Sequence, residues 1–150
     1  MRSSMRTTVT RRLSPVAFAM ALGACATRAE YVVEGTERSI GVDGLITIAP
    51  QAEDVNRVKV ELEHLPPPER HDRRMRTFVV WLTPPDGATV RAGRLAYDRD
   101  SREGRLEATT PNDAVHVQVT AERESDVNAP SDVVVVSRHV VLTRSRTARR

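Results

Sequence analysis

Hydrophobic and polar residues alternate along most of the chain from Val42 onward, and this period-two pattern predicts β-strands. Residues 57–65 alternate valine or leucine with charged residues, which indicates a half-buried strand. Residues 77–82 are apolar on both faces, which is typical of a central strand. Residues 114–120 alternate again, and residues 132–136 are rich in β-branched valine. No segment shows a sustained helical apolar stripe, so the pattern predicts an all-β fold.

Three weaker segments, 45–48, 89–97 and 105–109, raise the expected total to about seven strands in about 100 residues. That spacing favours an immunoglobulin-like antiparallel β-sandwich. Within 89–97 the alternation slips at Gly93, which predicts a β-bulge. Trp81 lies in the most apolar strand, so we expect it in the core, although with Tyr97 it could instead form a binding platform.

Turn dipeptides separate these strands. Asp43-Gly44, Asp86-Gly87 and Glu103-Gly104 each predict a turn, the last of them a hairpin. Three prolines followed by an arginine-rich stretch, residues 66–74, predict an exposed connection.

The first 24 residues have the organisation of a signal peptide. Residues 1–12 are basic, and residues 13–22 form an apolar stretch that is too short to span a bilayer, which needs about 20 residues. Its length fits the apolar region of an export signal. Small residues follow, and then Cys25, the only cysteine of the chain. A mature domain without further cysteine would have no disulfide and would depend on its core.

The order Leu22-Gly23-Ala24-Cys25 resembles the lipobox of bacterial lipoproteins. The resemblance implies cleavage between Ala24 and Cys25, a diacylglycerol on the Cys25 sulfur and an acyl chain on its new amino group. It implies no cofactor besides this covalent lipid. Ala26 replaces the aspartate that retains such proteins in the inner membrane, so we expect a cell-envelope protein on the outer membrane, facing the periplasm. Ordinary secretion and a cytosolic location are the alternatives.

Four regions follow from these patterns. Residues 1–24 are the expected lipoprotein signal peptide. Residues 25–41 are a lipidated N-terminus, either a tether or a first strand, and Tyr31 and its valine neighbours favour a strand. Residues 42–143 are the expected β-sandwich, and residues 144–150 a basic, disordered tail.

A second resemblance covers residues 78–135. Phe78–Leu82, Pro84–Gly87, Gly93–Leu95, Val117–Glu122 and Pro130-Ser131 follow in the order of the periplasmic β-sandwich domain of anti-sigma-K-type factors. The chain departs from that family because no transmembrane helix and no zinc-binding sigma-factor domain precede these residues. The resemblance therefore implies a fold and a compartment but not control of a sigma factor.

The net charge of +3 is unevenly distributed. Residues 1–24 hold four arginines and no acid, and their removal leaves a charge of −1. The tail holds four more, and without it the body carries −5. Nucleic-acid binding needs positive charge on the folded surface, so we expect no nucleic-acid partner. The tail could contact an anionic surface or an acidic envelope partner through Arg144, Arg146, Arg149 and Arg150.

The histidines show no metal-ligand spacing. His64 continues the apolar face of its strand, His71 lies in the arginine-rich connection and His116 lies on a solvated face. The stretch Asp98–Arg102 begins like a calcium loop but lacks its later ligands. The acidic stretch 122–132 is expected to be a solvated turn.

These patterns predict no catalytic or metal residues. They predict an envelope lipoprotein whose β-sandwich is a non-catalytic binding, adaptor or structural module. The alternative is an envelope hydrolase whose site is assembled in space from histidine and carboxylate residues such as His64, His71 and the pair Glu61 and Glu63.

Overall fold

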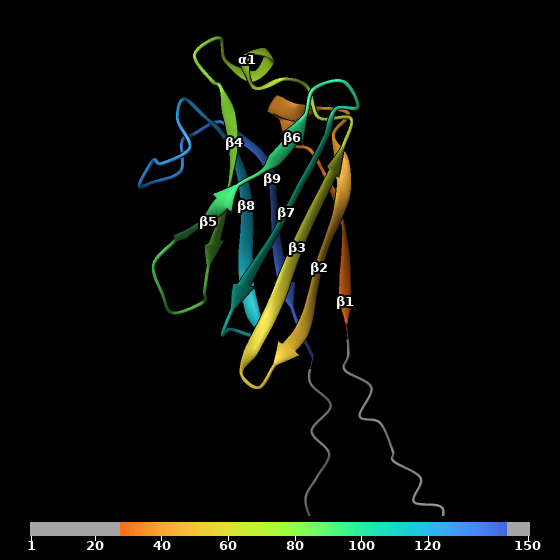
Figure 1. The fold of residues 1–150 in the computed structure, drawn as a ribbon, viewed down its shortest axis with the longest axis vertical. Coiled ribbons are helices and arrows are strands. Elements are labelled where there is room, and N and C mark those ends of the chain that lie inside the picture. The colour runs from red at the N-terminus through yellow and green to blue at the C-terminus, as the bar shows by residue number, and fades with distance from the viewer. Residues whose placement is uncertain (1–27, 144–150) are drawn as a thin grey trace, which may run out of the picture.

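The computed structural model describes residues 28–143, which form two antiparallel β-sheets packed face to face (Figure 1). The five-stranded sheet has the order β1-β2-β3-β7-β6, and the four-stranded sheet has the order β5-β4-β8-β9. The all-β sandwich is confirmed, with nine strands where the sequence predicts about seven. The strands are β1 (Ala29–Glu34), β2 (Asp43–Ala52), β3 (Val55–Glu63), β4 (Thr77–Thr83), β5 (Val90–Arg94), β6 (Ala96–Asp98), β7 (Glu103–Thr110), β8 (Ala114–Glu122) and β9 (Val134–Val141).

The first additional strand is β1, which pairs with β2 from Ala29 opposite Ile48 to Glu34 opposite Asp43. The segment that the sequence leaves open between tether and strand is therefore a strand over residues 29–34. A short 3-10 helix, η1 (Glu37–Ser39), then leads into β2. The sandwich includes β1 and η1, so it begins before the expected boundary at residue 42.

The second additional strand arises because the predicted segment 89–97 divides into β5 and β6. Val80 pairs with Gly93 and Trp81 with Arg91, which leaves Ala92 as an extra residue. The predicted bulge is confirmed, and Gly93 has a φ of 153° that other residues rarely adopt. Leu95 then donates its N–H to the Phe78 carbonyl oxygen at 2.9 Å, and the chain passes from the four-stranded to the five-stranded sheet.

The inward positions of both sheets form one hydrophobic core. Alternate residues of β3 and β8 face it, as the period-two pattern predicts. Its largest fully buried side chains include Phe78, Ile46, Ile48, Leu62 and Leu65. Trp81 is also buried, at 1% exposure, but it lies outside this cluster.

The two sheets are joined along one side of the sandwich. There β1, an edge strand of the five-stranded sheet, lies beside β9, an edge strand of the four-stranded sheet. The Thr36 N–H donates to the Val135 carbonyl oxygen at 2.9 Å, and the Thr36 hydroxyl donates to the Val134 carbonyl oxygen at 2.6 Å. At the other end of this seam, the Tyr31 hydroxyl bonds the backbone of Val141. The seam is therefore fixed at both ends.

Two predicted turns are wrong, because both glycines lie inside strands. Gly44 belongs to β2 and Gly104 to β7. A Cβ on Gly44 would lie 2.1 Å from the Glu61 carbonyl oxygen, and one on Gly104 would lie 2.3 Å from Leu95 Cδ2. These glycines permit close packing rather than chain reversal.

The actual turns lie a few residues earlier in the chain. One falls at residues 40–41, and the other is the β6–β7 turn at residues 99–102. In the latter the Asp98 carboxylate accepts the N–H groups of Asp100 and Ser101 at 2.8 and 3.1 Å. The calcium-like stretch is therefore a turn held by its own aspartate. The predicted turn at Asp86-Gly87 is confirmed.

The connection between β3 and β4 is less exposed than predicted. It contains a short helix, α1 (Pro68–His71), and it inserts Pro68 and Met75 into buried positions. Its arginines stay at the surface. Within the described residues, no helix has the length and apolar character needed to cross a membrane.

Candidate functional site

The two ends of the sandwich domain lie together. Cys25, Ala24 and the tail residues Arg144, Arg146, Arg149 and Arg150 are outside the residues that the structure describes. The described chain nevertheless shows where both segments attach. It enters β1 and leaves β9 at the same end of the sandwich (Figure 1). We call this the terminal end.

Tyr31 connects these two attachment points. Its hydroxyl donates to the Val141 carbonyl oxygen at 2.8 Å and accepts the Val141 N–H at 2.9 Å. The Arg138 guanidinium lies over its ring, 5.5 Å from the centroid. Leu142 adds a hydrogen bond from its N–H to the Asp113 carbonyl oxygen at 2.6 Å. The geometry of the terminal end is therefore set by side-chain as well as backbone bonds.

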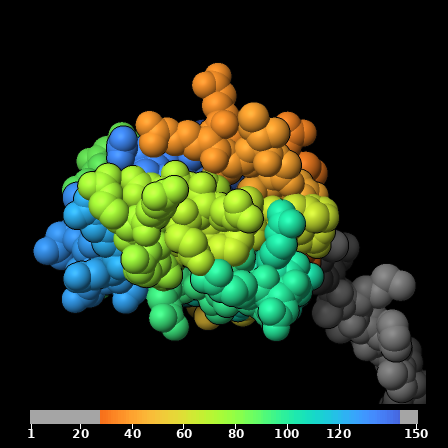
Figure 2. Space-filling model, turned by 90° about the horizontal axis from the view of Figure 1, so that it is seen from above, coloured from red at the N-terminus to blue at the C-terminus, as the bar shows by residue number. Residues whose placement is uncertain are grey.

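The opposite end includes the η1 segment, the α1 connection, the β6–β7 turn and the connection after β8 (Figure 2). Its arginines are partly neutralised. Arg99 lies 2.6 Å from a Glu69 oxygen, and Arg74 lies 2.9 Å from an Asp72 oxygen. Hydrogen bonds from these arginines lower the pKa of Glu69 and, more strongly, that of Asp72. This end of the sandwich therefore carries mixed charge, with two of its arginines paired to acids.

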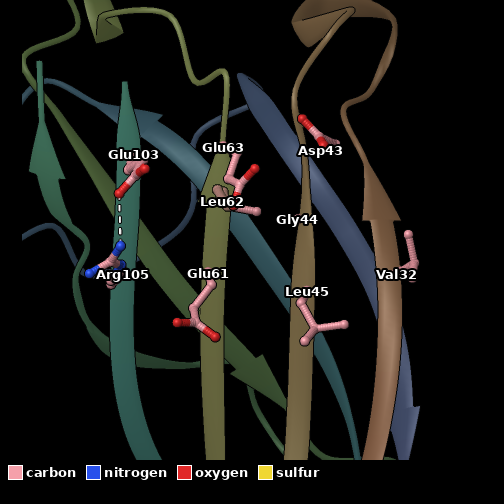
Figure 3. Close-up of a pocket in the computed structure, with 9 residues that line it drawn as sticks. All are labelled: Val32, Asp43, Gly44, Leu45, Glu61, Leu62, Glu63, Glu103 and Arg105. Atoms are coloured by element: carbon pink, nitrogen blue, oxygen red, sulfur yellow. Dashed lines mark hydrogen bonds and ion pairs between the residues drawn. The ribbon is translucent and has the colours of Figure 1, made fainter. Parts of the chain in front are cut away.

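A groove of about 320 Å³ crosses the outer face of the five-stranded sheet near this opposite end (Figure 3). Leu45 lies on its floor, and most of its polar lining is acidic. Arg105 lies 2.8 Å from a Glu103 oxygen, and Lys59 lies 2.8 Å from a Glu61 oxygen. The groove therefore has carboxylates in excess of nearby cations, and its other polar lining includes Asp43 and Glu63.

Strand register places two of these carboxylates, Asp43 and Glu63, in one row with Glu34. Asp43 on β2 is the register partner of Glu34 on β1 and also of Glu63 on β3. Like charges directly opposite one another on neighbouring strands are destabilising. Asp43 pairs with His64, whereas Glu34 and Glu63 have no ion-pair partner among the described residues. Two carboxylates of this row therefore have no ion-pair partner among the described residues.

His64 follows this row, and the expectation for its side chain is wrong. The sequence places it on the apolar face of its strand, but β3 ends at Glu63 and His64 has a positive φ of 54°. Its exposed ring lies with Nδ1 at 2.6 Å from Asp43 Oδ1, while Leu65 takes the buried position. The hydrogen bond to Asp43, and then the charge of Asp43, raise the pKa of His64. Glu63, His64 and Asp43 thus form one cluster that offers both nitrogen and oxygen ligand atoms.

His71 lies apart from this cluster, at the end of α1. Its Nδ1 is 3.2 Å from the Ser39 hydroxyl and 3.2 Å from the Arg38 carbonyl oxygen, and its ring packs edge-on against Phe78 at 5.7 Å. Burial lowers its pKa, although the carbonyl oxygens of Arg38 and Pro66 oppose this effect. The imidazole therefore joins η1 to the core as a largely neutral group.

The Ser39 and His71 contact does not form an open hydrolytic site. Ser39 is only 2% exposed, so its hydroxyl is not presented to a substrate. The His64 ring is bound to Asp43, and Glu61 is paired with Lys59. Of the residues named for the hydrolase alternative, His64 and Glu63 lie together beside Asp43, whereas His71 lies apart from them.

His116 and His139 are register partners on β8 and β9. His116 Nε2 lies 2.7 Å from the Ser137 hydroxyl oxygen, and His139 is exposed. His116 lies on a partly solvated face, as predicted. The sequence did not predict that a second histidine would lie opposite it, because the register of β9 was unknown.

The acidic stretch 122–132 is not wholly a solvated turn, because Glu122 is 4% exposed. Its Oε1 accepts the Thr120 hydroxyl at 2.5 Å and the Ser131 N–H at 2.7 Å. Thr120 in turn accepts the Trp81 indole N–H at 2.8 Å. Trp81 is therefore a buried anchor for the connection after β8. Tyr97 lies elsewhere, edge-on to Phe78 with its hydroxyl bonded to the Leu65 carbonyl oxygen, so the two rings form no common platform.

The cluster of Asp43, Glu63 and His64 was missed in the sequence for two reasons. Asp43 is assigned there to a turn, and His64 to a buried face. A hairpin centred on Glu53-Asp54 would have brought Asp43 and Glu63 within one residue of each other. The bulge between Pro50 and Ala52 shifts the strand pairing by one more residue, which places Asp43 directly opposite Glu63.

No family model matches the chain, and comparisons with curated proteins and with solved structures also find no match.

Proposed function

We propose that the chain is a cell-envelope lipoprotein that is anchored through lipid on Cys25. In this proposal the β-sandwich is a non-catalytic binding, adaptor or structural module, held on the periplasmic side of the outer membrane. The lipobox residues Leu22–Cys25 identify the anchor. The observation that carries the proposal furthest is that both chain ends leave the sandwich at the terminal end.

The spacing between anchor and domain restricts the position of the sandwich. Only Ala26, Thr27 and Arg28 separate Cys25 from β1. An extended chain spans at most about 3.5 Å per residue, so a lipid on Cys25 would keep the start of β1 within about 14 Å of the membrane surface. The terminal end would then face the lipid, and the groove near the opposite end would face away from it. A module with this orientation presents its acidic groove to the periplasm.

The basic tail would share the membrane-proximal side. It begins at Arg144, directly after the described end at Thr143, and carries four arginines in seven residues. A basic residue near an anionic lipid surface contributes about 1 kcal/mol. Several acyl chains on Cys25 supply the anchor itself, because one chain gives only marginal binding. The tail would therefore set the orientation of the domain more than its affinity for the membrane.

Intact mass of the protein from the membrane fraction of its own cells tests the anchor. We expect a mature form that begins at Cys25 and is heavier by its acyl chains. An inhibitor of lipoprotein signal peptidase should cause the precursor to accumulate, and Cys25→Ser should abolish the lipid. A full-length, unmodified chain in the soluble fraction would refute the proposal.

Trypsin protection tests the orientation. The lipidated protein is reconstituted in vesicles of zwitterionic lipid, with or without anionic lipid. We expect slower cleavage after Arg144 and Arg146 in the anionic vesicles, and unchanged cleavage at Arg73 near the opposite end. Equal protection in both vesicle types would exclude a contact between the tail and anionic headgroups.

A further inference from the structure

We propose that Asp43, Glu63 and His64 form a binding site for a divalent transition-metal cation, with Zn²⁺ as its representative. The site lies beside the groove near the end opposite the chain termini. The proposal is independent of the lipid anchor, since it depends only on side chains of the folded sandwich.

The donor set has the composition of a three-ligand metal site. Each residue offers one ligand atom, and these atoms lie within 4.8 Å of one another. Zinc binds carboxylate oxygen and imidazole nitrogen at about 2.0–2.2 Å, so two ligands of a tetrahedral zinc ion are about 3.3–3.6 Å apart. Side-chain rotations would bring the three atoms to that separation, with Asp43 Oδ1 and His64 Nδ1 moving apart from their present 2.6 Å. All three side chains are exposed, so solvent rather than packed side chains surrounds them during this adjustment.

The histidine distinguishes this cluster from an ordinary group of surface acids. Imidazole favours zinc, copper and nickel, whereas sites with oxygen ligands alone favour calcium and magnesium. The positive φ of His64 lies directly after the end of β3, and its ring is turned to Asp43 on the neighbouring strand. The nitrogen donor thus lies beside a carboxylate from another strand.

The strand register gives an independent reason for a cation at this position. Glu34, Asp43 and Glu63 lie opposite one another on β1, β2 and β3, where like charges repel. Arg105 is bound to Glu103, and Arg102 donates instead to the His64 carbonyl oxygen. Among the described residues, neither of these arginines therefore forms an ion pair with Glu34 or Glu63. A bound ion with two positive charges would offset two of the three negative charges in this row.

Accessibility also fits a metal with an incomplete protein shell. Asp43 and Glu63 line the open groove, so water can complete the coordination of an ion held by three protein ligands. Glu34 lies next in the row and could bind one of these waters. We expect one tightly bound ion per chain.

Isothermal titration of the purified full-length chain with Zn²⁺ tests the site. We expect a stoichiometry of one and a loss of affinity of about tenfold or more in His64→Gln and in Glu63→Gln. Glu107→Gln, at an exposed position on β7, should leave the affinity unchanged. Mg²⁺ at the same concentration should not compete. No saturable binding, or equal affinity in His64→Gln, would overturn the proposal.

The cross-strand pair of His116 and His139 is the rival location and needs its own control. His139→Gln removes one nitrogen of that pair without changing the proposed ligands. We expect Zn²⁺ to bind His139→Gln as tightly as the unaltered chain. Binding that is lost in His139→Gln but retained in His64→Gln would assign the ion to β8 and β9 and refute the proposal. Circular dichroism of each variant confirms that the sandwich is folded.

Discussion

The Tyr31 hydroxyl makes two hydrogen bonds to the backbone of Val141, one as donor at 2.8 Å and one as acceptor at 2.9 Å. The two residues are 110 positions apart in the sequence and belong to different sheets. One side chain thus substitutes for the backbone pairing that would otherwise join β1 to β9. It also fixes the first strand beside the last, next to both chain ends.

Tyr31→Phe should destabilise the sandwich by about 0.5–1.5 kcal/mol, because two hydrogen bonds are lost while the ring is retained. Chemical unfolding monitored by circular dichroism measures this change. Hydrogen exchange of the Val141 amide should become faster as well. Val32→Thr, at a position on the same strand that is 72% exposed, is the control and should have little effect. An unchanged exchange rate at Val141 would contradict the role given to Tyr31.

Thr120→Val should cost about 1–3 kcal/mol. The substitution removes the acceptor of the Trp81 N–H and a donor to buried Glu122, while side-chain volume is nearly preserved. Trp81 is the only tryptophan, so its fluorescence reports unfolding at this position.

Thr109→Val is the matched control for Thr120→Val, since Thr109 is exposed on β7. Its unfolding free energy should change by less than about 0.5 kcal/mol. Limited proteolysis should also cut the connection after Glu122 faster in Thr120→Val. Equal stability of the two variants would show that the network does not hold this connection.

Acid should weaken the fold through His71. Burial lowers the pKa of His71 below its usual value of 6.5, so folding favours the neutral ring. The stabilisation is present above pH 6.5 and is lost as the pH falls through the pKa of the folded state. Unfolding free energies measured between pH 8 and about pH 5 should therefore decrease more steeply in the unaltered protein than in His71→Gln. His139→Gln, an exposed control, should retain the steep dependence, and the same slope in all three proteins would contradict this role.

Gly104→Ala should destabilise the protein by about 1–3 kcal/mol, because the new Cβ would overlap Leu95 in the core. The predicted separation from Leu95 Cδ2 is 2.3 Å, and Leu65 Cδ2 lies 3.2 Å away. The cost should be smaller in a Leu95→Ala background, where the overlapping atoms are absent. A double-mutant cycle of unfolding free energies measures this coupling. Additive effects would indicate that Gly104 is required for another reason.

The sequence predicts the sandwich well where alternation is regular. In β3 and β8 the valines identify the buried face, and around Gly93 the slip in alternation identifies the bulge. The sequence pattern predicts the wrong structure where a glycine serves close packing inside a strand rather than a turn. Gly44 and Gly104 follow acidic residues as turn glycines do, yet they are required by contacts with Glu61 and Leu95 that only the folded chain creates.

The candidate metal cluster could not be predicted because it depends on strand register. Asp43 and Glu63 are 20 positions apart, and a bulge in the β2–β3 hairpin decides that they lie opposite each other. The alternation of β3 predicts an inward-facing His64, but the strand ends one residue earlier, at Glu63. A single backbone change at the end of a strand thus moves a histidine from the core to the surface.

Edge strands are templates for pairing between molecules, because one side of each has backbone groups without partners. In this sandwich β1 lies against β9, fixed by Tyr31 and Thr36, and β5 continues into β6 across the other side. The contacts between β1 and β9 thus keep these two edge strands beside each other. Opening the Tyr31 seam would therefore expose a strand edge and promote edge-to-edge aggregation as well as loss of stability.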